Sequence, residues 1–301
     1  MLMNYDQPTL VVMVFLCGLL LQSCEEDFSP KAPFEQKLVV FSLLTAAQDT
    51  QYVLISRTYD VEGFDPFRNR QSPEVPDAEV KVTRDDEMTI FFQDTTIQLD
   101  SNERYGEEGV AYYAAGFRIL PRRLYRLEVQ SPAYGRVTAS FGTPDAVRIG
   151  HSIDHETDDL LVTATSRGAK GFLIRLFVVY KLTSDKIAVE KALEVPILIT
   201  NDGERIYPQV DRLNTRRFRR DLIAAVLGDA LRSASSGTVE DIGRIVVVWA
   251  LDPNAYNYYQ IVRGFNDPFS VRVDEPDYTN IEGGLGVFGG VLVDSLFVRT
   301  Q

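Results

Sequence analysis

Short runs in which apolar and polar residues alternate dominate the chain from Lys37 onward. The runs that predict β-strands in the first half are Lys37–Leu44, Gln51–Arg57, Glu79–Thr83, Thr89–Phe92, Leu124–Gln130 and Arg136–Phe141. In residues 79–83 the valines alternate with polar residues, which places the valines on one face of a strand. A turn sequence at residues 131–135 separates two of these strands. Closely spaced short strands predict a β-sandwich of the immunoglobulin-like or transthyretin-like kind over residues 36–143.

The pattern of the second half is again rich in strands, with two helices inserted. The predicted strands are Leu160–Ser166, Gly171–Leu182, Glu194–Thr200 and Arg244–Leu251. One helix is expected near residues 215–233, where Phe218, Leu222 and Val226 recur at helical spacing. A second helix is expected near residues 253–263, because Asp252 and Pro253 suit the N-cap and the first helical position. Residues 144–301 therefore predict a second, β-rich domain in a mainly β protein.

Arginines gather at the start of the first predicted helix, at positions 216, 217, 219 and 220. Cations at the N-terminus of a helix interact unfavourably with its dipole. Two explanations remain open for this cluster. The arginines have acidic partners within the fold, or they form a solvated charged face, which is the favoured interpretation in an acidic chain.

The N-terminus has the pattern of an export signal. Leu10–Leu21 is apolar and uncharged, but it is shorter than the roughly 20 residues that a transmembrane helix needs. Leu21-Gln22-Ser23-Cys24 then resembles a bacterial lipobox, which predicts removal of residues 1–23 and lipidation of Cys24. A plain secretory signal with a coincidental cysteine is the alternative. The other cysteine, Cys17, lies in the segment removed, so the mature chain has no partner for a disulfide.

Residues 24–35 predict an acidic tether between the lipid and the first strand. Glu25, Glu26 and Asp27 resemble the surface-export signal of lipoproteins in the Bacteroidetes. The prolines at positions 30 and 33 favour an extended backbone in this segment. An ordinary solvated acidic linker remains the alternative, and it would leave the protein on the periplasmic side.

Composition and charge exclude several classes of protein. Hydrophobic residues make up 45% of the chain, which is enough for a packed core and excludes general disorder. The 31 basic residues are outnumbered by 43 acidic ones, giving a net charge of −12. Such a chain repels phosphate backbones, so no nucleic-acid partner is expected.

Few motifs in the chain carry chemistry. Gly284–Gly289 matches G-x-G-x-x-G, but too few residues follow for a βαβ unit, so we expect a structural glycine-rich bend and no bound nucleotide. His151 and His155 form a weak candidate metal site, with a polar surface loop as the alternative. Catalytic signatures are absent from the sequence, so we expect neither enzyme activity nor a cofactor. A hydrolase built on a β-sandwich is the remaining enzymatic alternative.

Two long loops carry aromatic residues and prolines, a combination that suits a protein interface. Phe64 and Phe67 lie in residues 59–76, and Phe265 and Phe269 lie in residues 264–280. We predict that these four phenylalanines contact a partner. The alternative is that they fold back onto the domain as small satellite cores.

Several segments together resemble the DUF4249 family of lipoproteins from the Bacteroidetes. They are residues 37–40, 75–82, 125–129, 256–259 and above all Asn280–Gly289, with the sequence NIEGGLGVFG. The resemblance spans nearly the whole mature chain and implies an outer-membrane lipoprotein, facing the cell exterior, with members often encoded beside TonB-dependent receptors. It therefore implies a non-catalytic binding or accessory subunit of a SusC-like barrel transporter, much as SusD-like lipoproteins are. A structural or adhesive surface module without a transporter partner is the alternative.

Overall fold

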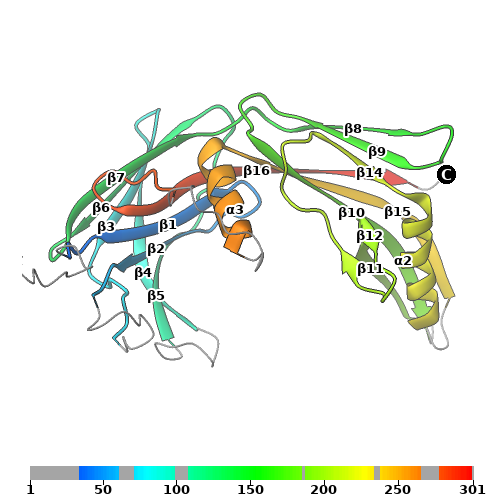
Figure 1. Cartoon of the computed structure of the whole chain (residues 1–301), viewed down its shortest axis with the longest axis horizontal. Helices are drawn as coiled ribbons and strands as arrows, with labels where there is room; N and C mark the ends of the chain where they lie inside the picture. Colours follow the sequence, from blue (N-terminus) through cyan, green and yellow to red (C-terminus); the bar gives the residue numbers. More distant parts are fainter. Residues whose placement is uncertain are drawn as a thin grey trace, which may run out of the picture. The chain divides into compact units, whose positions relative to one another are not determined.

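Strands form most of the protein. The computed structural model describes residues 34–60, 71–98, 108–184, 187–233, 238–265 and 278–299. The chain divides into two units after Glu35, and the strands and helices described below lie in the second, Gln36–Gln301. These elements confirm the predicted mainly β fold with inserted helices (Figure 1).

The elements follow one another along the chain in two groups. The first group is β1 (Leu38–Thr45), β2 (Gln51–Arg57), β3 (Glu79–Arg84), β4 (Thr89–Gln98), β5 (Glu108–Ala114), β6 (Leu124–Ser131) and β7 (Gly135–Gly142). The second begins with β8 (Arg148–Ile153), β9 (Leu160–Thr165), β10 (Gly171–Ser184), β11 (Ile187–Glu194), β12 (Leu198–Ile199), β13 (Arg205–Ile206) and β14 (Thr215–Phe218). It ends with α2 (Arg220–Ser233), β15 (Thr238–Leu251), α3 (Pro253–Phe265) and β16 (Leu285–Arg299).

The long strand β16 joins the two groups. In the described residues an 11-stranded sheet has the order β11-β10-β15-β16-β1-β2-β5-β4-β3-β6-β7. The first half of β16 pairs in parallel with β1, from Val39 opposite Leu285 to Thr45 opposite Val291. Its second half pairs antiparallel with β15, ending with Gly243 opposite Arg299. The expected division into domains at residue 143 stays a prediction, and β16 pairs with strands from both sides of it.

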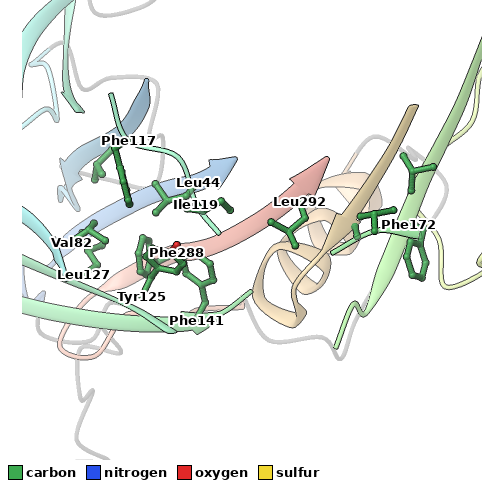
Figure 2. Packing of buried hydrophobic residues seen from close by; sticks show 14 of the residues in the cluster. Leu44, Val82, Phe117, Ile119, Tyr125, Leu127, Phe141, Phe172, Phe288 and Leu292 are labelled. Atoms are coloured by element: carbon green, nitrogen blue, oxygen red, sulfur yellow. The ribbon is translucent and has the colours of Figure 1, made fainter. Parts of the chain in front are cut away.

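The first group of strands closes into a sandwich around a buried core. The edge strand β7 returns to the segment before β16, where Thr138 and Glu282 exchange backbone hydrogen bonds. Behind that contact, the ring centroids of Phe141 on β7 and Phe288 on β16 lie 4.8 Å apart. Figure 2 shows these rings beside Tyr125 and Leu127 of β6 and Leu44 of β1. The same cluster of buried side chains continues through Leu292 to Phe172 of β10 (Figure 2).

The two helices start where local capping allows. Pro253 begins α3, and the Asp252 carboxylate accepts a hydrogen bond from the Ala255 N–H at 2.9 Å, which confirms the predicted N-cap. The other helix begins later than predicted, at Arg220. Residues 215–218 instead form β14, which pairs with β9 and buries Phe218 completely. Asp159, immediately before β9, accepts a hydrogen bond from the Arg220 N–H at 3.0 Å, so that contact sets the start of α2.

The glycine-rich segment is the first part of β16, so the closing strand starts earlier than residue 291. Gly286 has a φ of 109°, and a Cβ there would lie 2.0 Å from the Val40 carbonyl oxygen. A Cβ at Gly290 would lie 2.2 Å from the Phe141 ring. These glycines allow β1 and β7 to approach β16 closely, and the segment continues as a strand to Arg299, unlike a strand–turn–helix nucleotide motif.

Candidate functional site

Most residues that the sequence singled out lie outside the described part of the chain. The predicted lipidation site Cys24 and the acidic residues Glu25, Glu26 and Asp27 are among them. So are Phe64, Phe67 and Phe269 of the two loops. Phe265 is the last residue of α3, and its side chain is likewise outside the description. These assignments stay predictions.

The two histidines occupy different local structures. His151 lies on β8, whereas His155 lies in the turn that follows Asp154, and both side chains are exposed. Among the described residues, no group of three or more histidines, cysteines, aspartates and glutamates is arranged to hold a metal ion. No described helix has the length and apolar character needed to cross a membrane.

The arginine cluster has acidic partners within the fold, and Arg217, Arg219 and Arg220 keep about half or more of their side chains exposed, so it is also a solvated charged face. Arg216 pairs with Asp211, Arg219 with Asp221, and Arg220 with Asp158. Arg217 lies 3.0 Å from Asp154 and 3.4 Å from Asp159. The hydrogen bond from the Arg220 N–H, followed by the contacts with Thr157 and Arg217, holds the pKa of Asp159 below its usual range. The cluster therefore fastens β14 and the start of α2 to the β8–β9 hairpin.

A buried carboxyl group lies where α3 meets the glycine-rich strand. The Asp252 side chain is 1% exposed, and its Oδ1 accepts hydrogen bonds from the N–H groups of Ala255 and Gly290, at 2.9 and 3.1 Å. Burial raises the pKa of Asp252 to about 6, even though these hydrogen bonds favour the ionised form. Its oxygen is directed at backbone groups, so Asp252 links helix to strand.

Two asparagines complete this junction. The Asn254 side-chain amide donates to the carbonyl oxygens of Ser140 and Phe288, and its oxygen accepts from the Tyr278 hydroxyl at 2.6 Å. Asn280 exchanges two hydrogen bonds with the Phe288 backbone, at 2.8 and 2.9 Å. Both asparagines are half-buried, and their polar side-chain atoms are satisfied within the fold. The junction is therefore a structural clamp between β7, α3 and β16.

An aromatic stripe crosses the outer face of the sheet, on the side opposite the sandwich core. We define it as Phe91, Tyr113, Tyr52, Leu54 and Phe41. Tyr52 on β2 is directly opposite Tyr113 on β5, so the two side chains lie on the same face. Tyr52 is 49% exposed and Leu54, two residues further along β2, is 40% exposed.

The stripe continues across strands on both sides of this pair. Tyr113 is opposite Gln93 of β4, and Phe91, two residues before Gln93 on the same face, is 61% exposed. On the other side Leu54 is opposite Phe41 of β1. The Phe41 ring lies 5.1 Å from the ring of Tyr258, where the stripe reaches α3. Figure 1 shows α3 against β1 and β16 at this end.

Tyrosine, phenylalanine and leucine on neighbouring strands make this surface chemically suited to binding and not to acid–base chemistry. Aromatic side chains bury large areas at low entropic cost and are enriched in protein interfaces. Soluble proteins rarely expose contiguous apolar patches unless the patch contacts something. The stripe is therefore the described surface best suited to hold a partner.

The stripe was not predicted from the sequence, although its signal is present there. In β2 the residues Tyr52 and Leu54 are apolar on one face, while Val53 and Ile55 are apolar on the other. A strand that is apolar on both faces indicates burial on two sides. Here only one side is covered by the core. Partner-binding aromatics were expected in loops instead, because loops usually carry them.

The charged groove on the outer face of β3, β6 and β7 is a weaker candidate. Its volume is about 430 Å³, and it contains Lys81, Arg136 and Glu128. Glu128 pairs with Lys81 at 2.9 Å and with Arg136 at 2.6 Å, and these contacts, Lys81 first, hold the pKa of Glu128 below its usual range. The charges of these three side chains are directed at one another.

The fold and this surface define a mainly β protein with an aromatic outer face. Residues 25–296 match the family model described as "Domain of unknown function (DUF4249)", so the chain belongs to the DUF4249 family. None of the curated proteins matches the sequence. A solved structure described as "Crystal structure of Dpr11 IG1 bound to DIP-gamma IG+IG2" is 10% identical, with a TM-score of 0.19. That match covers 86% of this chain and 98% of the other, and the fold assignment depends on the strand pairing above.

Proposed function

We propose that this protein is a lipid-anchored outer-membrane protein that docks on a TonB-dependent, SusC-like barrel transporter as a non-catalytic accessory subunit. The lipid is carried by Cys24, and the acidic residues after it direct the protein to the cell surface. The aromatic stripe provides the contact with the barrel. The stripe is the observation that carries this proposal, and the lipobox and the family resemblance support its location.

The exposure of the stripe favours a partner over a purely internal role. Phe91 and Tyr52 have about half or more of their side chains in water, although both lie on central strands of the sheet. Exposed aromatic residues of this kind become the main contributors when an interface covers them. The predicted loop anchors Phe64, Phe67, Phe265 and Phe269 would extend the same contact.

Co-purification from solubilised outer membranes tests the docking proposal. The double variant Phe91→Ser with Tyr52→Ser should reduce recovery of the barrel with the tagged protein. Loss of two interface aromatics costs about 2 kcal/mol or more, which corresponds to at least a roughly 30-fold weaker affinity. The melting temperature should change little, because exposed substitutions usually cost less than about 1 kcal/mol.

A matched control lies on a different surface. Phe297 on β16 is 45% exposed and is not part of the stripe, so Phe297→Ser should leave barrel recovery unchanged. Unchanged recovery for the stripe double variant would reject the stripe as the docking surface. The same assay measures barrel recovery for the two loop double variants, Phe64→Ala with Phe67→Ala and Phe265→Ala with Phe269→Ala. If no variant affects recovery, the adhesive-module alternative replaces this proposal.

Fractionation tests the anchor separately. Cys24 is the only thiol left after removal of residues 1–23, so Cys24→Ser should leave the precursor uncleaved or release the protein from the outer membrane. Several acyl chains give stable anchoring, whereas one gives marginal binding. A Cys24→Ser protein that is still cleaved and fractionates fully with the outer membrane would contradict lipidation at this site.

A further inference from the structure

A second cavity lies apart from the aromatic stripe, between the β8–β9 hairpin, the first turn of α2, the middle of β15 and the end of β16. Its volume is about 520 Å³, within the usual range of small-molecule sites. Several separate elements supply its walls, and the ion pairs of the arginine cluster fasten the hairpin to β14 and to the start of α2. We call it the hairpin pocket. Figure 1 shows the elements that surround it.

One side of the hairpin pocket is aliphatic. Ile153 on β8 is opposite Leu160 on β9, and both line the pocket with Ile223 of α2 and Val298 of β16. Ile153 is 49% exposed, so a large aliphatic surface faces the opening without cover. The lining contains no phenylalanine, tyrosine or tryptophan, and its one ring is the imidazole of His151 on β8. This side suits a flexible aliphatic group.

The other side is cationic, in a chain with a net charge of −12. Arg220, Arg244 and Arg299 line the pocket, against one acidic residue, Asp158. Arg220 is paired with Asp158 at 2.6 Å, and Arg244 is held by Asp241 through hydrogen bonds of 2.5 and 2.9 Å. Arg299 is exposed and makes no ion pair with any residue that the structure describes, so among the three lining arginines it is the one whose guanidinium group is not already held by a described acidic residue.

The placement of these two sides points to one class of ligand. We propose that the hairpin pocket binds a small amphiphilic carboxylate, with the acid group at Arg299 and the aliphatic chain against Ile153, Ile223 and Val298. A guanidinium group offers two parallel N–H donors that match a carboxylate. The aliphatic chain gains about 0.8 kcal/mol for each methylene removed from water, so both parts of the ligand contribute.

This site is independent of docking on a barrel. Its ligand is defined by a free carboxylate and an aliphatic chain, the two parts that a short or medium-chain fatty acid combines. Octanoate serves as the probe because it has one carboxylate and a short aliphatic chain. Octanol keeps the chain without the charge, and acetate keeps the charge without the chain.

Calorimetric titration of the full chain in a neutral detergent tests the proposal. Octanoate should bind saturably, octanol more weakly and acetate not measurably. Arg299→Gln should weaken octanoate binding by about fivefold and leave octanol binding unchanged, because only the charged contact is lost. Ile153→Asn should weaken both. Both residues are exposed, so the variants should fold.

Arg232→Gln is the matched control. Arg232 lies in the last turn of α2, the helix whose first turn lines the pocket, and is itself outside the pocket. It should bind octanoate like the unmodified chain. Because octanoate partitions into the detergent equally in every titration, the difference between variants is free of that effect. Failure of octanoate to bind saturably would overturn the proposal. So would equal octanoate affinity in the Arg299→Gln, Ile153→Asn and Arg232→Gln variants.

Discussion

Asp252 combines two roles that oppose each other when it ionises. As an N-cap, its carboxylate is favoured by the backbone N–H groups of Ala255 and Gly290 and by the dipole of α3. As a buried group, it loses the hydration that a carboxylate has in water. The loss of hydration is the larger effect, because the pKa of Asp252 is raised from 3.8 to about 6. The junction between α3 and β16 is therefore more stable with a neutral cap.

This opposition predicts a specific pH dependence of stability. Between pH 4 and 6 the folded protein keeps the Asp252 proton, whereas the unfolded chain has released it. The native state then binds more protons, so the free energy of unfolding falls as the pH rises through that window, by roughly 3 kcal/mol in all. Asp252→Asn keeps an acceptor oxygen without the charge. The variant should match the unmodified chain near pH 4 and exceed its stability near pH 7.

Denaturant titrations at several pH values measure this difference. Taking the difference between the two proteins cancels the other titrating groups, including Asp86, whose hydrogen bond to Arg84 lowers its pKa to about 2. Asp77→Asn, at an exposed position, is the control and should show no such trend. A stability gap for Asp252→Asn that stays constant from pH 4 to 7 would refute the assignment.

At the scale of elements, local chemistry made most strands and both helices predictable. Alternation identified β3, and the Asp252–Pro253 pair identified the start of α3, because these signals act within a few residues. The start of α2 was mispredicted because long-range pairing decides it. Phe218 has helical spacing with Leu222, yet β9 recruits residues 215–218 as β14, and Asp159 caps the helix after them.

The elements that could not be predicted from the sequence are those whose residues are required by contacts with segments far away along the chain. Gly286 and Gly290 weaken the strand pattern of β16, but they are required by the close approach of Val40 and Phe141. The alanines and tyrosines of β5 lack simple alternation, since Tyr112 and Tyr113 point to opposite faces. The same property explains why the aromatic stripe was missed. A strand that is apolar on both faces indicates two contact surfaces, but its sequence does not show whether the second surface is covered by this chain or by a partner.

At the scale of the whole molecule, β16 connects the two groups of strands, because it pairs with β1 of the first group and with β15 of the second. One hydrophobic cluster contains Leu127 of β6 and Val246 of β15, and β16 pairs with strands on both sides of the boundary that the sequence suggested. If this strand couples the halves, removing a buried side chain in the first half destabilises the second. The chain has a single tryptophan, Trp249, and its fluorescence reports on the second half because it lies on β15.

Leu127→Ala is the change that tests this coupling. Leu127 is 1% exposed in the sandwich core, and removing such a side chain costs about 2–5 kcal/mol. With coupled halves, the Trp249 fluorescence transition should move down by about 5 °C or more, together with the transition seen by circular dichroism. Independent domains would give a different outcome, in which part of the circular dichroism signal melts early while the Trp249 transition keeps its temperature. Leu231→Ala, at an exposed position on α2, should move neither transition. A shared shift would mean that β16 makes the two halves one cooperative unit, because it is the strand that pairs with both β1 and β15.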